Sequence, residues 1–443
     1  MILAHGVGVR SDLPIPLWLF VDAAAAALVI SFLLLGLLWR RPLLATAAQG
    51  RSVRLPPTLA TTISIALRTF GLATFGLVLA AALFGSDSSA SNPAPRWFYV
   101  VFWVGVPLIS FVTGDVWKVL SPFDSLAAIG QGARDRRLTG TPTPNDPGEQ
   151  DSIAFTHWPA LIGLVGFLWL ELAYHEPDSP RVIGVAMGVY AVGIITATAK
   201  WGRAWLRTGE GFTVLFHLIA AMSPIEVLDG RLRIRVPFSG LATLPRRRGL
   251  LGVVLVVLGG TAFDGFSRTS YWKDVIGDLE GWTLTALNTI GLVWMICVVT
   301  VLWTVASRIS ARLVGRDPTD RSEIERYATA LVPIVLAYAI AHYFSLFYFE
   351  AQTAIAQISD PFAKGADIFG TIDWQPDYTS LSPDLISYVQ VFAIVIGHVA
   401  GVTVAHDQAE GELSHRLAIK SQYPYLAVMV AYTVAGLLLL LNA

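Results

Sequence analysis

The sequence predicts an all-α polytopic membrane protein in which residues 1–443 form a single integral membrane domain. Three observations support this class. The chain is 54% hydrophobic and only 14% charged, whereas soluble globular chains carry about 25% charged residues. Ten stretches have the roughly 20 mostly apolar residues that a membrane-spanning helix needs. Lys and Arg residues are concentrated in alternate loops between these stretches.

The ten predicted spans are distributed along the chain, and the fourth, fifth and sixth are short. In order they are Leu17–Trp39, Leu59–Gly85, Trp97–Val116, Trp158–Tyr174, Val182–Thr198, Gly249–Phe266, Trp282–Ala306, Tyr327–Phe349, Leu385–Ala405 and Tyr425–Leu441. Trp and Tyr residues at many span ends are typical of side chains that lie at the membrane–water interface.

The distribution of positive charge predicts how the chain is threaded. The loops after the odd-numbered spans hold 24 of the 31 Lys and Arg residues, the opposite loops hold six, and Arg68 lies within the second span. Cytoplasmic loops are enriched in Lys and Arg. We therefore expect both termini to be extracytoplasmic.

Two segments between spans have features of their own. Residues 209–248 begin with a short apolar stretch flanked by basic residues, which predicts a helix that lies in or re-enters the cytoplasmic interface. Asp229 and Gly230 between two alternating runs predict a small cytoplasmic β-hairpin. Residues 350–384 carry six acidic residues and form the longest external loop, which is long enough to act as a lid over a site.

Several functional classes lack their sequence signals. Cys297 is the only cysteine, which excludes an intramolecular disulfide or a cysteine metal cluster. The basic loops are short and contain no nucleic-acid-binding motif. The sequence contains no phosphate-binding loop, dinucleotide fingerprint, His-Glu-x-x-His or Cys-x-x-Cys-His motif. A loose similarity between residues 114–124 and 209–226 leaves both a duplication and a chance match open.

Ionisable residues in the outer half of the membrane form the first candidate site. Ionisable groups are costly there and usually have a partner or a function. A rise of about 1.5 Å per residue places Glu171, Asp264 and His342 about 20–22 Å from the inner ends of their spans, with His175 about 6 Å higher. Glu171 and His175 are four residues apart and are predicted to share a helix face. His5, before the first span, can reach the same rim.

Imidazole and carboxylate groups suit Zn²⁺ or another divalent metal, or a proton relay. We therefore take Glu171 and Asp264 as candidate catalytic residues, and His175, His342 and His5 as candidate metal ligands. The structural alternative is that each group makes only a helix-to-helix hydrogen bond, and that Asp264 caps a helix end.

A second set, Asp115, His398, His406 and Asp407, is predicted in the inner half. His398 lies roughly 12 Å from His342 in depth, which is too far for a shared metal. Lys118 and Arg68 are candidates to neutralise Asp115. His406 and Asp407 are predicted to be a hydrated interfacial pair, and small residues beside His398 (Gly397 and Gly401) predict a close helix contact.

Five sequence segments resemble a family of polytopic bacterial membrane proteins, many of them actinobacterial, labelled fenitrothion hydrolase. The segments are Ala4–Gly6, Arg10–Phe20, Gly209–Phe216, Gly260–Thr269 and Gly397–Asp407. The resemblance implies a bacterial inner-membrane location and hydrolysis of an organophosphate triester. It carries over no catalytic residues.

Two kinds of function follow from these expectations. The first is metal-dependent hydrolysis of an apolar ester in the outer-half cavity, where a metal would activate water. The second is translocation of a proton, metal ion or small solute, or a role as a subunit or assembly factor of a larger membrane complex. The expected partners are the lipid bilayer, an apolar small molecule or other membrane subunits, and no nucleic acid.

Overall fold

The protein is described here by a computed structural model covering residues 17–135, 155–228 and 230–441. Helices dominate these residues. In chain order the elements are α1 (Leu17–Leu38), α2 (Leu44–Ala47), β1 (Arg51–Arg54), α3 (Pro57–Phe84), α4 (Ala94–Arg96), η1 (Trp97–Gly105), α5 (Val106–Thr113), α6 (Trp117–Leu120), α7 (Pro122–Asp135), α8 (Trp158–Leu172), α9 (Pro180–Trp201), η4 (Arg203–Trp205), α10 (Leu206–Gly209), α11 (Gly211–Ala220), β2 (Ile225–Leu228), β3 (Arg231–Ile234), η5 (Ser239–Thr243), α12 (Leu250–Ser267), α13 (Ser270–Ile276), α14 (Gly281–Leu313), α15 (Arg321–Glu325), η6 (Ala328–Leu331), α16 (Val332–Gln357), α17 (Pro383–Glu412) and α18 (His415–Leu441).

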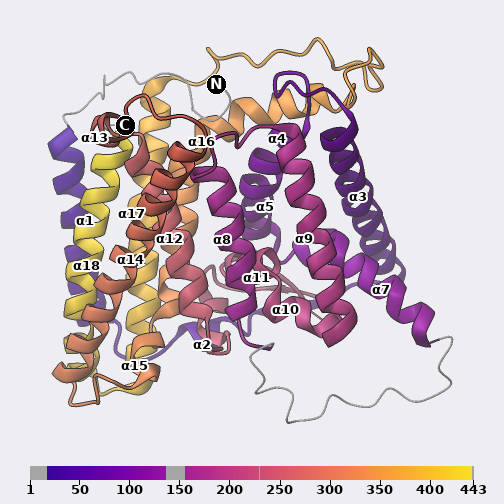
Figure 1. Ribbon diagram of the computed structural model, residues 1–443. Coiled ribbons are helices and arrows are strands. Elements are labelled where there is room, and N and C mark those ends of the chain that lie inside the picture. Colours follow the sequence, from indigo (N-terminus) through magenta and orange to yellow (C-terminus); the bar gives the residue numbers. More distant parts are fainter. Residues whose placement is uncertain (1–16, 136–154, 229, 442–443) are drawn as a thin grey trace.

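The long helices stand side by side in one bundle (Figure 1). Within the described residues, eight helical runs are long and apolar enough to cross a membrane: α1, α3, α4 to α5, α9, α12, α14, α15 to α16, and α17. The shorter α8 stands among them, and α18 runs the height of the bundle beside α1. The start of α1 and the end of α18 lie at the same end of the bundle.

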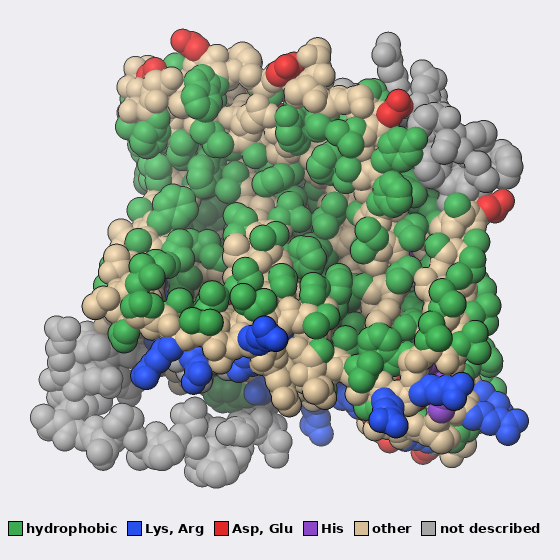
Figure 2. Space-filling view, turned by 180° about the vertical axis from the view of Figure 1, so that it is seen from behind, with side chains coloured by type: hydrophobic (Ala, Val, Ile, Leu, Met, Phe, Trp, Pro, Cys, Tyr) green, Lys and Arg blue, Asp and Glu red, His purple; other side chains and the backbone are tan. Residues whose placement is uncertain are grey.

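The bundle has a buried centre and an apolar outer surface. Helix α12 is buried along most of its length, and α16 along most of its first half. The outer helices α1, α3, α9 and α14 expose large apolar side chains, such as Leu38 and Val189, each more than two-thirds exposed. On the face shown in Figure 2, apolar side chains form a broad belt, exposed Lys and Arg gather at the lower end, and most of the visible Asp and Glu lie at the upper end. We call these the basic end and the acidic end.

Three predicted helices differ from the observed ones. The third predicted span contains a π-helical stretch, η1, before α5, which ends at Gly114 with a φ of 91°. Pro107 cannot donate an intrahelical hydrogen bond, which is compatible with wider winding before it. The fourth span ends at Leu172 rather than Tyr174. The apolar stretch predicted to lie in or re-enter the interface forms only the ten-residue helix α11, which is buried along most of its length and exposes His217.

A small antiparallel sheet has the strand order β1-β3-β2, and its strands β2 and β3 come from the segment predicted to form a hairpin. Strands β2 and β3 pair with Ile225 opposite Ile234, and Gly230 adopts a φ of 70°. Strand β1 was not predicted. Its four residues are all exposed and too few to show an alternating pattern, so only the pairing with β3 reveals it.

Arg68, the one basic residue predicted inside a span, joins α3 to α7 and the start of η4. Its Nη1 lies 2.8 Å from Asp124 Oδ2, and Arg203 donates to the same carboxylate at 2.5 and 2.6 Å. Although burial raises the pKa of Asp124, the hydrogen bonds from Arg203 and Arg68 bring that pKa below its usual value. Arg68 therefore does not neutralise Asp115, contrary to the prediction.

The low pKa of Asp124 makes the stability of the folded protein depend on pH. Its stabilising contribution is present above the pKa of the unfolded chain, about 3.9, and is lost as pH falls through the lower pKa of the folded state. We expect the Asp124→Asn variant to melt at a lower temperature at neutral pH and to lose less stability below pH ~4. Thermal unfolding in detergent across pH measures this. Asp87→Asn, which removes the exposed ion pair with Arg181, is the control and should change little.

Candidate functional site: a buried carboxylate network

Asp264 is the centre of a cluster of ionisable side chains. It lies near the C-terminal end of α12, toward the acidic end of the bundle. Its side chain is 5% exposed. Arg268, one turn later, donates to Oδ1 at 3.0 Å, and the Tyr343 hydroxyl donates to Oδ2 at 3.0 Å. His342 Nε2 lies 2.6 Å from the same Oδ2. Asp264 is therefore held by three groups from two helices, and does not act as a simple helix cap.

Glu171, on α8, is the second carboxylate of the cluster. Its Oε1 lies 3.3 Å from the Tyr343 hydroxyl, and its Oε2 is buried with no hydrogen-bond partner among the described residues. Tyr343 thus connects two carboxylates. A hydroxyl has one proton to donate, so it cannot donate to Glu171 and Asp264 at once. Both contacts are satisfied together when Glu171 carries a proton and donates it to the Tyr343 oxygen.

His342 and Tyr343 enter the cluster from neighbouring positions on α16. The His342 ring stacks on Tyr338, with ring centroids 5.7 Å apart, and is nearly perpendicular to the Tyr343 ring. Among the described residues, neither His342 nitrogen makes a hydrogen bond of regular geometry, although Nε2 lies close to Asp264. The ring is therefore held by packing and by its contact with Asp264.

A cavity of about 70 Å³ adjoins the cluster, and we call it the acidic-end cavity. Both carboxylates, Arg268 and Tyr343 line it. Its wall also includes Arg96 and Glu350, which form an ion pair at 2.6 Å, and Tyr99, which the π-helical stretch carries. None of the residues lining it comes from 358–384. Of the segment predicted as a lid, residues 350–384, Glu350 on α16 contributes to the wall of this cavity.

His175 lies apart from the cluster, so the predicted face shared with Glu171 does not form. Helix α8 ends at Leu172, and the Tyr174 N–H bonds five residues back to Trp169, which breaks the helical spacing. His175 Nδ1 instead lies 2.9 Å from the Thr285 hydroxyl on α14, and its ring packs on Trp282. His5 lies outside the described residues.

The cluster does not fit the predicted metal site. Within the described part of the chain, no three His, Cys, Asp or Glu side chains are placed to hold one ion. Asp264 and His342 are adjacent, but the Arg268 guanidinium already occupies one oxygen of that carboxylate. A second positive charge there would be repelled by Arg268. The arrangement suits a proton better than a divalent cation.

The four inner residues lie at three separate places rather than in one site. Asp115 pairs with His217 of α11 at 2.9 Å, not with Lys118 or Arg68 side chains. His398 donates from Nδ1 to the Ile394 carbonyl at 2.8 Å, and its Nε2 is buried without a partner among the described residues. His398 lines a small apolar pocket between helices.

His406 and Asp407 are buried, which corrects the predicted hydrated pair. They are 0% and 2% exposed. His406 Nε2 donates to the Trp39 carbonyl at 3.0 Å. Asp407 accepts hydrogen bonds from the Trp39 indole and the Leu43 and Leu44 N–H groups. Both side chains therefore anchor the chain after α1 to α17.

Two members of the cluster were not predicted from the sequence. Arg268 was counted only as a basic residue of an external loop, although its spacing of four residues from Asp264 is readable as an ion pair. Tyr343 is adjacent to His342, but a tyrosine in an apolar helix gives no signal that its hydroxyl joins two carboxylates. These two residues determine what Asp264 and Glu171 can do.

The fold and the cluster define a class: a helical bundle of membrane-spanning dimensions with ionisable side chains buried between its helices. Comparison of the chain with models of known protein families, with curated proteins and with solved structures finds no match in any of the three.

Proposed function

We propose that this chain is a ten-span membrane protein that binds and releases a proton at the Glu171–Tyr343–Asp264–His342 network and couples it to movement of a small solute or ion. The ten spans are the eight long apolar runs together with α8 and α18. The positive-inside rule assigns the basic end to the cytoplasm and both termini to the outside. The resemblance to bacterial proteins favours the inner membrane.

The observation that carries this proposal is the single Tyr343 hydroxyl between two buried carboxylates. One added proton satisfies both contacts of the Tyr343 hydroxyl, and its loss leaves two carboxylates competing for that hydroxyl. Intramembrane Asp, Glu and His residues in such chains typically mark proton relays in pumps and transporters. The cavity beside Glu171 offers a route to the acidic end.

Ester hydrolysis, which the resemblance implies, has less support from the geometry. A cavity of about 70 Å³ is well below the roughly 300 Å³ at which pockets for drug-sized ligands begin. The described carboxylates and histidines do not converge as metal ligands. A proton needs neither a large pocket nor such a ligand set.

Infrared spectroscopy of the lipid-reconstituted protein tests the proton site directly. We expect a protonated-carboxyl stretching band that changes with pH, disappears in Glu171→Gln and shifts in Tyr343→Phe, which removes the bridging hydroxyl. Glu176→Gln, an exposed neighbour beyond the end of α8, is the matched control and should keep the band. A band unchanged in Glu171→Gln would contradict the proposal.

Proton flux into liposomes then tests whether the network lies on a proton path. With a pH-sensitive dye inside, we expect the wild-type protein to dissipate an imposed proton gradient and Glu171→Gln to do so at least about tenfold more slowly. Equal rates for wild type and Glu171→Gln would show that the carboxyl group is not on the transport path.

A further inference from the structure

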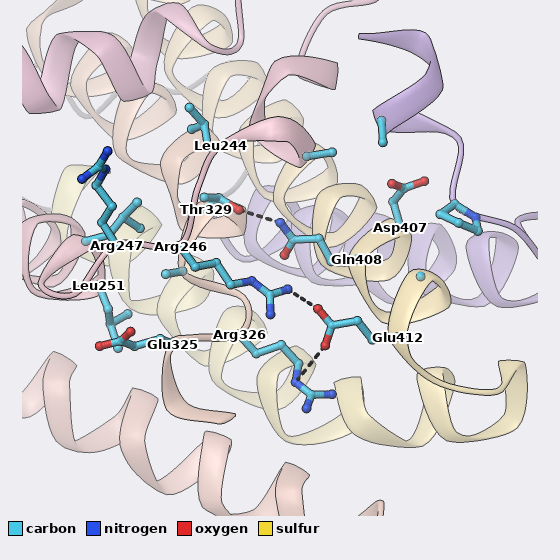
Figure 3. Close-up of a pocket in the computed structure, with 16 residues that line it drawn as sticks. Leu244, Arg246, Arg247, Leu251, Glu325, Arg326, Thr329, Asp407, Gln408 and Glu412 are labelled. Carbon is cyan, nitrogen blue, oxygen red and sulfur yellow. Dashed lines mark hydrogen bonds and ion pairs between the residues drawn. The ribbon is translucent and has the colours of Figure 1, made fainter. Parts of the chain in front are cut away.

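A larger cavity, of about 200 Å³, opens at the basic end of the bundle, and we call it the basic-end cavity (Figure 3). Four segments that are distant in the sequence meet there: the start of α2, the stretch before α12, the turn between α15 and η6, and the last turns of α17. Three arginines line it, namely Arg246, Arg247 and Arg326. The cavity is unrelated to the proton network at the acidic end.

Arg326 is the buried charge of this cavity. Its side chain is 4% exposed, and Nη2 bonds the buried Glu323. Its Nε and Nη1 are buried with no hydrogen-bond partner among the described residues, and Glu412 Oε2 lies 3.8 Å from Nε. A buried guanidinium with two unfilled donors is costly unless an acceptor reaches it.

Glu412 already places one anionic group between two of the arginines. Its carboxylate bonds Arg246 and faces Arg326, as the dashed lines in Figure 3 show. It is 30% exposed and lies at the end of α17, so it can be displaced. Among the described residues, Arg247 makes one long hydrogen bond, 3.5 Å from Nη1 to the Phe155 carbonyl. The arginines therefore have more donors than the described acceptors use.

The other acidic residues of the cavity wall are already occupied. Asp407 accepts three hydrogen bonds from the segment after α1. Glu325 pairs with Arg321 at 3.0 Å. A ligand at this place is thus recognised by free arginine donors, and arginine forks match the oxygens of a phosphate group.

We propose that the basic-end cavity binds a phosphate group, supplied either by the headgroup of an anionic phospholipid or by free phosphate. The volume suits one phosphate and its immediate substituents, and is smaller than a pocket for a drug-sized ligand. Basic pockets between helices at the cytoplasmic side are typical sites for anionic headgroups. In the bound state the phosphate oxygens accept from Arg326, Arg247 and Arg246, and Glu412 moves out of the cavity.

The test uses the full-length protein and two probes. Inorganic phosphate is titrated by calorimetry into protein held in phosphatidylcholine nanodiscs. In the second arm, native mass spectrometry compares retention of phosphatidylglycerol with phosphatidylcholine of the same acyl chains. Binding in the first arm identifies free phosphate as a ligand, and selective retention in the second identifies the lipid headgroup.

Two variants and a matched control make the test specific without touching Arg326, whose loss would remove one of the two arginine partners of the buried Glu323. Arg247→Gln removes a cavity-lining charge and should weaken binding about tenfold. Glu412→Gln removes the competing carboxylate and should tighten binding. Arg248→Gln, an exposed neighbour that does not line the cavity, should leave binding unchanged. Absence of binding in both arms, or equal weakening by Arg247→Gln and Arg248→Gln, would overturn the proposal.

Discussion

Replacement of Asp264 by Asn is expected to destabilise the folded protein by about 3–5 kcal/mol, because it removes one partner of a buried ion pair. Asn has nearly the same volume, so the effect comes from charge. Arg268, whose side chain is 24% exposed, loses its carboxylate, and His342 and Tyr343 lose a common acceptor. Denaturant or thermal unfolding in detergent measures the loss. The same variant should abolish the pH-dependent infrared change.

A double-mutant cycle separates the ion pair from general disruption of α12. Removing both charges, in Asp264→Asn with Arg268→Gln, should recover part of the stability lost by Asp264→Asn alone. Asp278→Asn, an exposed carboxylate in the segment after α13, is the control and should stay within about 0.5 kcal/mol of wild type. Strictly additive losses in the cycle would show that Arg268 does not stabilise Asp264.

Depth along a membrane helix could be predicted from the sequence, and this is what located the cluster. The rise per residue of a helix is nearly constant, so counting along three spans placed Glu171, Asp264 and His342 at one level. The structure brings His342 within 2.6 Å of Asp264 and connects Glu171 to Asp264 through Tyr343. The same counting separated His398 from His342, and the structure places His398 at a different pocket.

Helix ends and the direction in which a side chain points could not be predicted in this way. The prediction for His175 required α8 to continue for one more turn. Instead, the Tyr174 N–H bonds to Trp169, five residues back, and the His175 ring contacts Thr285. His406 and Asp407 were expected at a hydrated interface because their span ends there. They are buried because the chain after α1 folds against α17, a long-range contact that no local pattern encodes.

The close contact of α16 with α17 leads to the second large effect. The small residues around His398 predicted a close helix contact but not its partner, and the structure places both Gly397 and Gly401 against α16 or the turn before it. A Cβ atom on Gly397 would lie 2.1 Å from Ala337 Cβ and 2.8 Å from the Pro333 carbonyl oxygen, so the helices would have to separate. A Cβ on Gly401 would lie 2.7 Å from the Ala330 carbonyl oxygen.

Gly397→Ala is therefore expected to destabilise the protein by about 3 kcal/mol, the upper part of the usual range for overpacking. The sign of this change in unfolding free energy is informative, because an Ala in a helix is favoured over Gly by about 1 kcal/mol where its methyl group meets no steric clash. Gly193→Ala on α9, where a Cβ would meet nothing within 4 Å, should be neutral or stabilising. Unfolding of both variants in the same detergent compares them. If Gly397→Ala were as stable as Gly193→Ala, the two helices could not be in the contact described. Loss of stability in Gly397→Ala alone would instead locate the effect at the α16–α17 interface, since both substitutions add the same methyl group to a helix.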